Sequence, residues 1–253
     1  MSILKTLNTR AETSQKSLAI LIDPDKVEDI SSLTGLLNLA KECYVDYFFV
    51  GGSLITQQNL DKVIKAIKSS CSIPTVLFPG SNMHLDLSAD GILFLSLISG
   101  RNPDLLIGQH VVAAPILKNS GIEVLPTGYI LINSERTSAV SYMSNTSPIP
   151  PDKYSIAAST AMAGEMLGLK LIFIDAGSGA REAITPKMIQ QVKKSVNVPV
   201  IVGGGINSAA KAKASLEAGA DVIVIGNAAE KNPNLVIEVS EKIYDFNKSL
   251  NIH

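Results

Sequence analysis

Eight short apolar runs alternate along this chain with longer segments of helical periodicity. Runs this short and this apolar are typical of parallel strands that are buried on both faces. Eight strand–helix units favour one parallel (β/α)8 barrel, an α/β fold, over a sandwich, with an open doubly wound sheet as the alternative. The expected strands are 18–22, 47–50, 75–78, 91–97, 129–132, 171–174, 199–202 and 222–225.

The length of the chain agrees with one barrel. Its 253 residues match the size of about 250 that is usual for this fold. We therefore expect a single domain over residues 1–253, with an N-terminal helix over 1–17. Further helices are expected over 31–44, 57–70, 185–196 and 208–218, with Thr185 and Ser208 or Asn207 as caps.

One strand–helix unit is too short. Between Gly80 and Gly91 only residues 81–90 remain, which is less than an ordinary helix and two loops require. We expect a barrel whose third helix is missing or replaced. A long apolar substrate or a partner subunit would then cover the exposed apolar surface, although a short helical turn that packs there is the alternative.

Glycines follow the last two expected strands, as Gly203-Gly204-Gly205 and Gly226-Asn227. Glycine lets backbone N–H groups approach an anion, and the N-terminus of the following helix adds partial positive charge. Two such loops predict the phosphate site that many (β/α)8 barrels carry after strands 7 and 8. The alternative is that both are ordinary tight turns.

Charge and hydropathy exclude several classes of protein. The net charge of −1 and the pI of about 6.3 give no field that attracts nucleic acid, so no nucleic-acid partner is expected. The longest apolar stretches, 92–98 and 169–174, fall short of the ~18 residues of a membrane span. The first residues lack a signal-peptide core, and Cys43 and Cys71 have no metal-ligand spacing, so we expect a cytoplasmic protein.

Three polar residues stand where strands end, which is where such barrels carry their active sites. Asp23 suits a hard divalent cation, although an Asp before Pro24 also opens turns. Ser53 suits a metal or phosphate contact, with a helix cap as an equal alternative. Asp175 is the candidate for handling a substrate hydroxyl, unless it only orients Ser178 or a backbone amide.

The remaining polar residues form no known catalytic set. Asp25 and Lys26 are interpreted as turn and solvent residues. His84, His110 and His253 form no constellation, and neither a Ser-His-Asp set nor a Walker loop is present. Carboxylates, hydroxyls and a phosphate cradle suit a substitution with a metal-bound leaving group.

Five motifs, in this order, resemble those of the geranylgeranylglyceryl phosphate synthase family, including the bacterial relatives that make heptaprenylglyceryl phosphate. They are LIDPDK at 21–26, VGGS at 50–53, FIDAGSGA at 173–180, VGGGI at 202–206 and IGN at 225–227. The resemblance runs from about residue 16 to 230. It implies a TIM-barrel prenyltransferase that joins the 3-hydroxyl of sn-glycerol 1-phosphate to a polyprenyl diphosphate, releasing diphosphate with Mg²⁺.

The resemblance also implies roles for individual residues. Asp23 and Ser53 match the metal ligands, and Asp175 matches the residue that assists the glycerol hydroxyl. The family's Tyr-Leu-Glu is Phe173-Ile174-Asp175 here, which shortens the carboxylate arm and removes a hydroxyl. Two motifs look closer to the geranylgeranyl branch. The implied substrate-binding residues are Phe173, Ile174, Asp175, Ala176, Gly177, Ser178, Gly179, Gly204, Gly205, Gly226 and Asn227.

Two other functions fit a phosphate-binding barrel. A sugar-phosphate isomerase or aldolase would want a lysine nucleophile or a carboxylate pair at the strand ends, and no lysine lies inside the expected strands. A non-catalytic sensor of a phosphorylated metabolite is the third interpretation. For the prenyltransferase we expect a homo-oligomer that contacts membranes transiently to release its lipid product.

Overall fold

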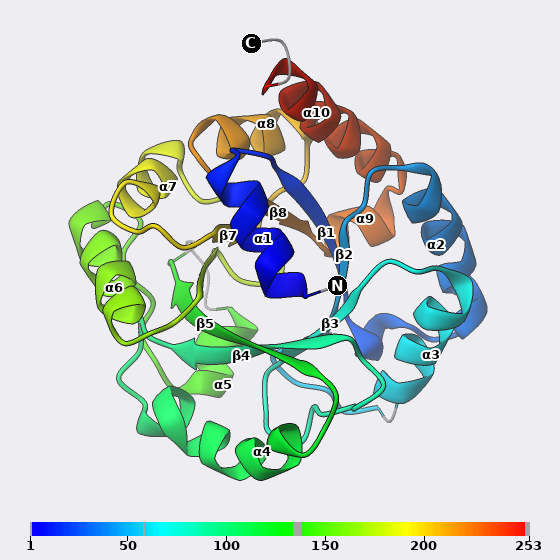
Figure 1. Ribbon diagram of the computed structural model, residues 1–253, viewed down its shortest axis with the longest axis horizontal. Helices are drawn as coiled ribbons and strands as arrows, with labels where there is room; N and C mark the ends of the chain where they lie inside the picture. The colour runs from blue at the N-terminus through cyan, green and yellow to red at the C-terminus, as the bar shows by residue number, and fades with distance from the viewer. Residues whose placement is uncertain (1, 58, 134–137, 251–253) are drawn as a thin grey trace.

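Eight parallel strands close into a barrel in the computed structural model, which describes residues 2–57, 59–133 and 138–250 (Figure 1). Each strand pairs with the one before it, and β8 pairs with β1. The predicted fold class is confirmed. The strands are β1 (Ser17–Ile22), β2 (Tyr47–Gly52), β3 (Thr75–Pro79), β4 (Gly91–Leu97), β5 (Glu123–Leu131), β6 (Leu171–Asp175), β7 (Val200–Gly203) and β8 (Val222–Ile225).

Helices surround the barrel, and those with an expected range, α1, α2, α3, α7 and α8, differ from it mainly at their ends. Thr185 and Ser208 cap α7 and α8, since each side chain accepts a hydrogen bond from the N–H of the third residue of its helix. The helix expected over 57–70 begins only at Leu60, and residue 58 lies outside the described residues. The α-helices are α1 (Ile3–Glu12), α2 (Leu33–Glu42), α3 (Leu60–Ser70), α4 (Gln109–Lys118), α5 (Ala139–Ser144), α6 (Tyr154–Met166), α7 (Pro186–Lys193), α8 (Ala209–Glu217), α9 (Asn227–Lys231) and α10 (Asn234–Leu250).

The expected boundaries of the fifth strand were wrong. Residues 126–128 contain proline and glycine and precede the expected strand 129–132, but they lie within β5, where Pro126 pairs with Phe94 of β4. Gly128 serves side-chain packing, because a Cβ there would lie 2.8 Å from Ile98 and 3.0 Å from Ile172. The strand therefore begins six residues earlier than predicted, at Glu123.

The missing helix is confirmed. Residues 80–90, all of them described, form only turns between β3 and β4. The turns are closed by backbone hydrogen bonds from His84 to Ser81 and from Ala89 to Asp86. The ring of helices is consequently open at the ends of β3 and β4. A one-turn π-helix, Asp104–Gly108, then leads from β4 into α4.

Alternation along the strands separates two apolar cores. Phe173 of β6 points into the barrel with Phe78 and Tyr129, whereas Ile174 points outward to the helices. The next residue, Asp175, points inward again at the end of the strand. This alternation determines which residues at the C-terminal end of each strand can reach the mouth of the barrel.

The N-terminal ends of the strands are closed by α1, which lies across the middle of the ring in Figure 1. Ile3 and Leu7 of α1 enter the inner core, and Glu123 accepts hydrogen bonds from the first N–H groups of the helix. The helix is shorter than the expected range 1–17, since Ser17 already begins β1.

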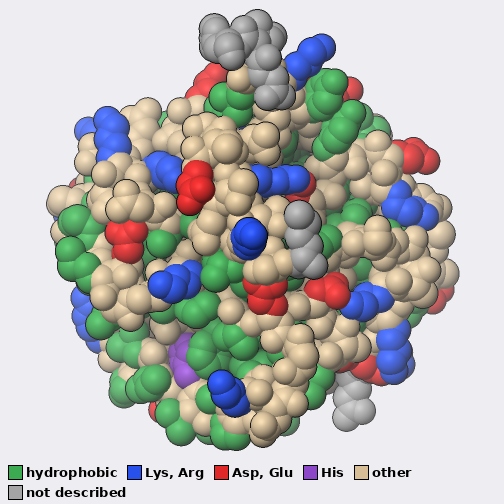
Figure 2. Space-filling view, viewed as in Figure 1, with side chains coloured by type: hydrophobic (Ala, Val, Ile, Leu, Met, Phe, Trp, Pro, Cys, Tyr) green, Lys and Arg blue, Asp and Glu red, His purple; other side chains and the backbone are tan. Residues whose placement is uncertain are grey.

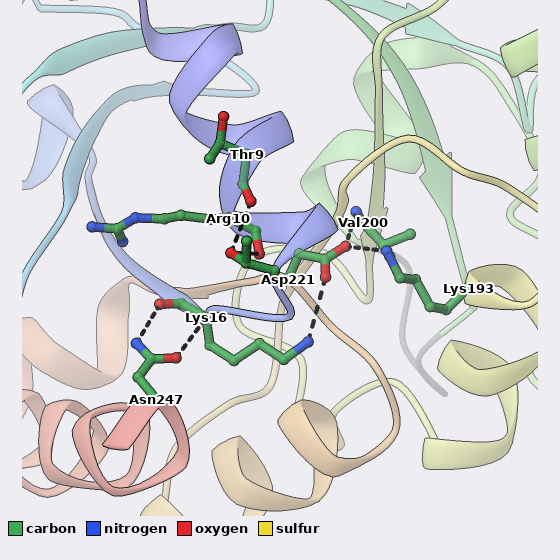
Figure 3. Close-up of polar contacts among 8 residues, drawn as sticks. Thr9, Arg10, Lys16, Lys193, Val200, Asp221 and Asn247 are labelled. Atoms are coloured by element: carbon green, nitrogen blue, oxygen red, sulfur yellow. Dashed lines mark hydrogen bonds and ion pairs between the residues drawn. The ribbon is translucent and has the colours of Figure 1, made fainter. Parts of the chain in front are cut away.

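A buried ion cluster lies at the same end of the barrel (Figure 3). Asp221 pairs with Lys193 at 2.6 Å and with Lys16 at 3.4 Å, and it accepts a hydrogen bond from the Val200 N–H. Burial lowers the pKa of Lys16, although Asp221 opposes that shift. Asn247 of α10 bonds both backbone polar groups of Lys16, which joins the last helix to the first strand.

Acidic and basic side chains are interspersed on the face shown in Figure 2. Hydrophobic side chains gather toward its lower edge, where Figure 1 places α4. Among the described residues, no helix combines the length and the apolar character that crossing a membrane requires.

Candidate active site

The C-terminal end of the barrel brings both predicted glycine loops together with the loop after β6. Gly204 and Gly205 have φ of +77° and +69°, which turns the chain sharply after β7. Among the hydrogen bonds of the described residues, none uses the N–H of Gly204, Gly205 or Gly226 as donor. These free donors can bind an anion, with Gly204 and Gly205 ahead of α8 and Gly226 ahead of α9.

Asn227 links the cradle to its neighbours. Its amide donates to Ser178 at 3.3 Å, and its amide oxygen accepts from Lys26. Loops from β1, β6 and β8 thus meet at one point. The interpretation of Lys26 as a solvent residue was incomplete, because its ammonium group also lies 3.1 Å from the Asp23 carboxylate.

Gly205 has a structural task in addition to any contact with an anion. A Cβ at this position would overlap the backbone carbonyl of Glu182 and lie 2.7 Å from the Ala183 nitrogen. A side chain at 205 would therefore displace the neighbouring loop and would not project into the anion site. At Gly179, where φ is +77°, an added Cβ meets nothing within 4 Å.

Asp175 is buried at the end of β6. One carboxylate oxygen accepts a hydrogen bond from the Gly177 N–H at 2.9 Å, and the other accepts from the Tyr129 hydroxyl. Burial raises the pKa of Asp175, and the two hydrogen bonds oppose that rise. Asp175 also borders the cradle, since a Cβ on Gly204 would lie 2.5 Å from its Oδ1.

The other predicted residues of β6 and its loop occupy three environments. Ile174 and Ala176 lie in the outer core, and Ala176 also borders Gly204 of the cradle. Phe173 is buried inside the barrel, with its ring 5.4 Å from that of Phe78. Ser178 and Gly179 are exposed at the mouth, as the cradle requires.

Asp23 and Ser53 lie on neighbouring loops. Asp23 is close to Gly52, where a Cβ would lie 3.5 Å from its Oδ1. The cap alternative for Ser53 is excluded, because the next helix begins only at Leu60 with Asn59 before it. Within the described chain, no three acidic, histidine or cysteine side chains gather as a complete metal site. One carboxylate and one hydroxyl fit Mg²⁺ that takes its other ligands from phosphate oxygens and water.

A cavity of about 650 Å³ opens where the helix after β3 is missing. It reaches from Ser53 at the mouth to Tyr129 inside the barrel. Apolar side chains form most of its wall: Leu54, Ile55, Leu60, Phe78, Met83, Leu85, Leu95, Leu97, Leu105, Val140 and Met143. The cavity therefore has the apolar character of a groove for an apolar chain.

The described histidines stand apart from each other. His84 lies on the cavity wall and accepts a hydrogen bond from the Gly80 N–H at 3.2 Å. Burial lowers the pKa of His84, and the negative charge of the nearby Asp25 opposes that shift. His110 contacts Ser96 at 3.2 Å and packs edge-on against Phe94. His253 lies outside the described residues.

Sequence reasoning missed Tyr129 and Lys26 as site residues. Tyr129 stands at an inward position two residues before the end of β5, a register that becomes readable only once the strand's boundaries are known. Lys26 follows Asp23 by three residues, the spacing of one helical turn, and this local signal was available.

The strands define a (β/α)8 barrel that is open on one side and carries free backbone N–H donors at its mouth. The sequence profile of the PcrB family matches residues 11–244, and the chain belongs to this family. It is 52% identical over 238 residues to the geranylgeranylglyceryl phosphate synthase of Spirosoma linguale, covering 94% of this chain and 95% of that one. It is 54% identical over 231 residues to the synthase of Chitinophaga pinensis, covering 90% of each.

A solved structure is also similar throughout. The (S)-3-O-geranylgeranylglyceryl phosphate synthase of Thermoplasma acidophilum, in complex with sn-glycerol-1-phosphate, superposes with a TM-score of 0.87. The two chains are 31% identical, and the match covers 99% of this chain and 98% of that one.

Proposed function

We propose that this protein transfers a geranylgeranyl group from its diphosphate to the 3-hydroxyl of sn-glycerol 1-phosphate. One observation carries the proposal: an anion cradle, a buried carboxylate and a long apolar cavity meet at one barrel mouth. Relatives that match at least 90% of this chain and are named for this activity support the proposal.

The acceptor substrate fits the cradle side of the mouth. The free N–H groups of Gly204, Gly205 and Gly226 bind the phosphate, and the Asn227 amide closes that side. Because Asp175 borders Gly204, the far hydroxyl of the glycerol reaches the carboxylate. Its raised pKa makes Asp175 a stronger base than an exposed aspartate.

The reaction exchanges one carbon–oxygen bond for another. The 3-hydroxyl oxygen forms a bond to C1 of the prenyl group as the bond from C1 to the diphosphate oxygen breaks. The electron pair of the broken bond leaves with the diphosphate, and the hydroxyl proton passes to Asp175. Products are the prenylglyceryl phosphate ether and diphosphate.

The donor's diphosphate fits the side of the mouth near Asp23. We propose that Asp23 and Ser53 hold Mg²⁺, which neutralises charge on the leaving diphosphate when it is bound. Lys26 is a second cation at this edge. The apolar tail lies in the cavity between β3 and β4, where burial contributes roughly 25 cal/mol per Å² of apolar surface.

We also propose that the protein is a homo-oligomer. Ile107, Val111, Val112 and Ile116, in and before α4, are between 48% and 63% exposed, which is unusual for such residues in a monomer. Light scattering after gel filtration tests the mass in solution, and a monomer at micromolar concentration would contradict the proposal. A cytoplasmic location and transient membrane contact stay predictions.

Incubation with sn-glycerol 1-phosphate, Mg²⁺ and radiolabelled geranylgeranyl diphosphate tests the activity. A labelled, phosphatase-sensitive lipid is expected, and it should not form with sn-glycerol 3-phosphate or without protein. Tight binding of glycerol 1-phosphate with no labelled product would favour the sensor instead. Turnover of a sugar phosphate in place of transfer would favour the isomerase or aldolase.

A further inference from the structure

Tyr129 stands between the two substrate sites. Its ring lines the cavity, and its hydroxyl donates a hydrogen bond to Asp175, the residue that borders the phosphate cradle. It is also buried, with only 4% of its surface exposed.

The barrel's register produces the contact. Leu131 of β5 pairs with Asp175 of β6, and Tyr129 lies two residues earlier on the same inward face. The tyrosine therefore stands one pleat below the carboxylate, and its long side chain reaches up to it. An alanine-sized or aliphatic residue at this place would leave that oxygen of Asp175 without a donor.

The ring itself is held from two sides. Its centroid lies 5.5 Å from that of Phe173 and 6.0 Å from that of Phe78, both in edge-on arrangements. Of these three rings only Tyr129 bears a hydroxyl group. Packing thus fixes the direction in which this hydroxyl points.

We propose that Tyr129 is a positioning residue for Asp175, whose hydroxyl holds the carboxylate in the orientation that receives the proton of the glycerol 3-hydroxyl. An ionised carboxylate offers about four acceptor positions. Gly177 and Tyr129 take one on each oxygen, and Oδ1 also borders Gly204 of the cradle. The inference deepens the proposed function and rests on it.

The surroundings of Asp175 make its ionisation depend on the Tyr129 hydroxyl. Among the described residues, Tyr129 is the titratable group that faces Asp175. The other neighbours are the glycines of the β7 end and the Gly177 backbone, with Ser138 beside it. Hydrogen bonding to Tyr129 favours the ionised carboxylate and opposes the rise in its pKa that burial causes. Loss of the hydroxyl should therefore raise the pKa of Asp175 further.

The test compares Tyr129→Phe with Tyr47→Phe in the full chain. Tyr47 is a buried tyrosine of the same inner core, with 3% of its surface exposed, and it lies at the opposite end of the barrel. For Tyr129→Phe we expect kcat to fall about 10-fold or more, as for loss of one hydrogen bond to a charged group. The KM for glycerol 1-phosphate should change less, and the acidic limb of the kcat/KM profile should move to higher pH. Tyr47→Phe should leave kcat and that limb in place.

A second variant, expected to shift the pH profile in the opposite direction, distinguishes the proposed role from a loss of folding. Tyrosine fluorinated beside the hydroxyl, incorporated at position 129, is a stronger donor and should move the acidic limb to lower pH. A Tyr129→Phe protein with wild-type kcat and an unmoved limb would overturn the proposal, as would a fluorinated protein whose limb moves upward.

Titration of the Asp175 carboxyl carbon by ¹³C NMR separates the two hypotheses. If wild-type protein forms no labelled lipid, the proposed function fails, and the titration still shows whether the hydroxyl stabilises the carboxylate. If the wild type is active and the Asp175 resonance titrates identically in wild type and Tyr129→Phe, the positioning role alone fails.

Discussion

The ammonium group of Lys26 lies 3.1 Å from the Asp23 carboxylate and also donates a hydrogen bond to the Asn227 amide oxygen. This joins the end of β1, the predicted donor side, to the end of β8, the predicted acceptor side. Asp23 is therefore already paired with a cation, and the metal ion proposed at Asp23 would share that carboxylate with Lys26.

Replacement of Lys26 by methionine should weaken donor binding. The change removes a positive charge beside the leaving diphosphate, so we expect the KM for geranylgeranyl diphosphate to rise about 10-fold, the value of one charge-assisted hydrogen bond. Lys26→Arg keeps the charge and should retain most of the affinity. Steady-state kinetics at saturating glycerol 1-phosphate measures both, and equal KM values for wild type and Lys26→Met would rule out this role.

Asp23→Asn tests the metal assignment. The change keeps the shape of the side chain and removes its charge, so activity should fall at least ~100-fold if several kcal/mol of charge stabilisation depend on it. Chelation with EDTA should abolish wild-type activity, and added Mg²⁺ should restore it. Glu217→Gln, an exposed change at the end of α8, is the control. Full activity of Asp23→Asn at ordinary Mg²⁺ would mean that the metal binds elsewhere.

Gly205→Ala and Gly179→Ala form a matched pair of glycine changes. Both positions have a positive φ, so both variants bear a similar backbone strain, of order 1–3 kcal/mol. Only at Gly205 does the new Cβ overlap the neighbouring loop at Glu182. We expect a clearly larger loss of stability for Gly205→Ala in urea unfolding. Equal losses of stability would show that the loop at Glu182 moves aside without a measurable cost in free energy.

Much of the barrel could be predicted from sequence, because each strand is a short run of apolar residues whose neighbours along the chain are helical. The start of β5 could not, since the reason for Gly128 is the space that Ile98 and Ile172 occupy. The contact of Lys26 with Asn227 joins residues 201 positions apart, and only closure of the barrel brings them together. The glycine loops could be predicted because their signal lies in consecutive residues. The partners of Asp175 could not, because they depend on the register between strands.

Asp221→Asn should destabilise the fold without a direct effect on the chemistry. Asp221 is the buried partner of Lys16, and its loss leaves that ammonium buried and uncompensated at the closed end of the barrel. Breaking a buried pair in this way costs about 3–5 kcal/mol. Asp61→Asn, which breaks the exposed pair with Lys65, should cost at most ~0.5 kcal/mol. Urea unfolding measures both, and a small effect at Asp221 would show that Lys16 finds another partner or loses its charge.

The cavity between β3 and β4 should determine which donors the protein accepts. Leu105, in the π-helical turn before α4, lines this cavity and is partly buried. Leu105→Trp fills part of the space that the prenyl tail would occupy. We expect the KM for geranylgeranyl diphosphate to rise about 10-fold or more, since losing about 60 Å² of apolar contact is worth about 1.5 kcal/mol. The shorter farnesyl diphosphate should be affected less, and the KM for glycerol 1-phosphate should stay nearly unchanged. Met166→Trp, at a side chain that is 84% exposed, is the control. If Leu105→Trp leaves the KM for geranylgeranyl diphosphate unchanged, the tail does not pass Leu105, and a different path out of the barrel must hold it.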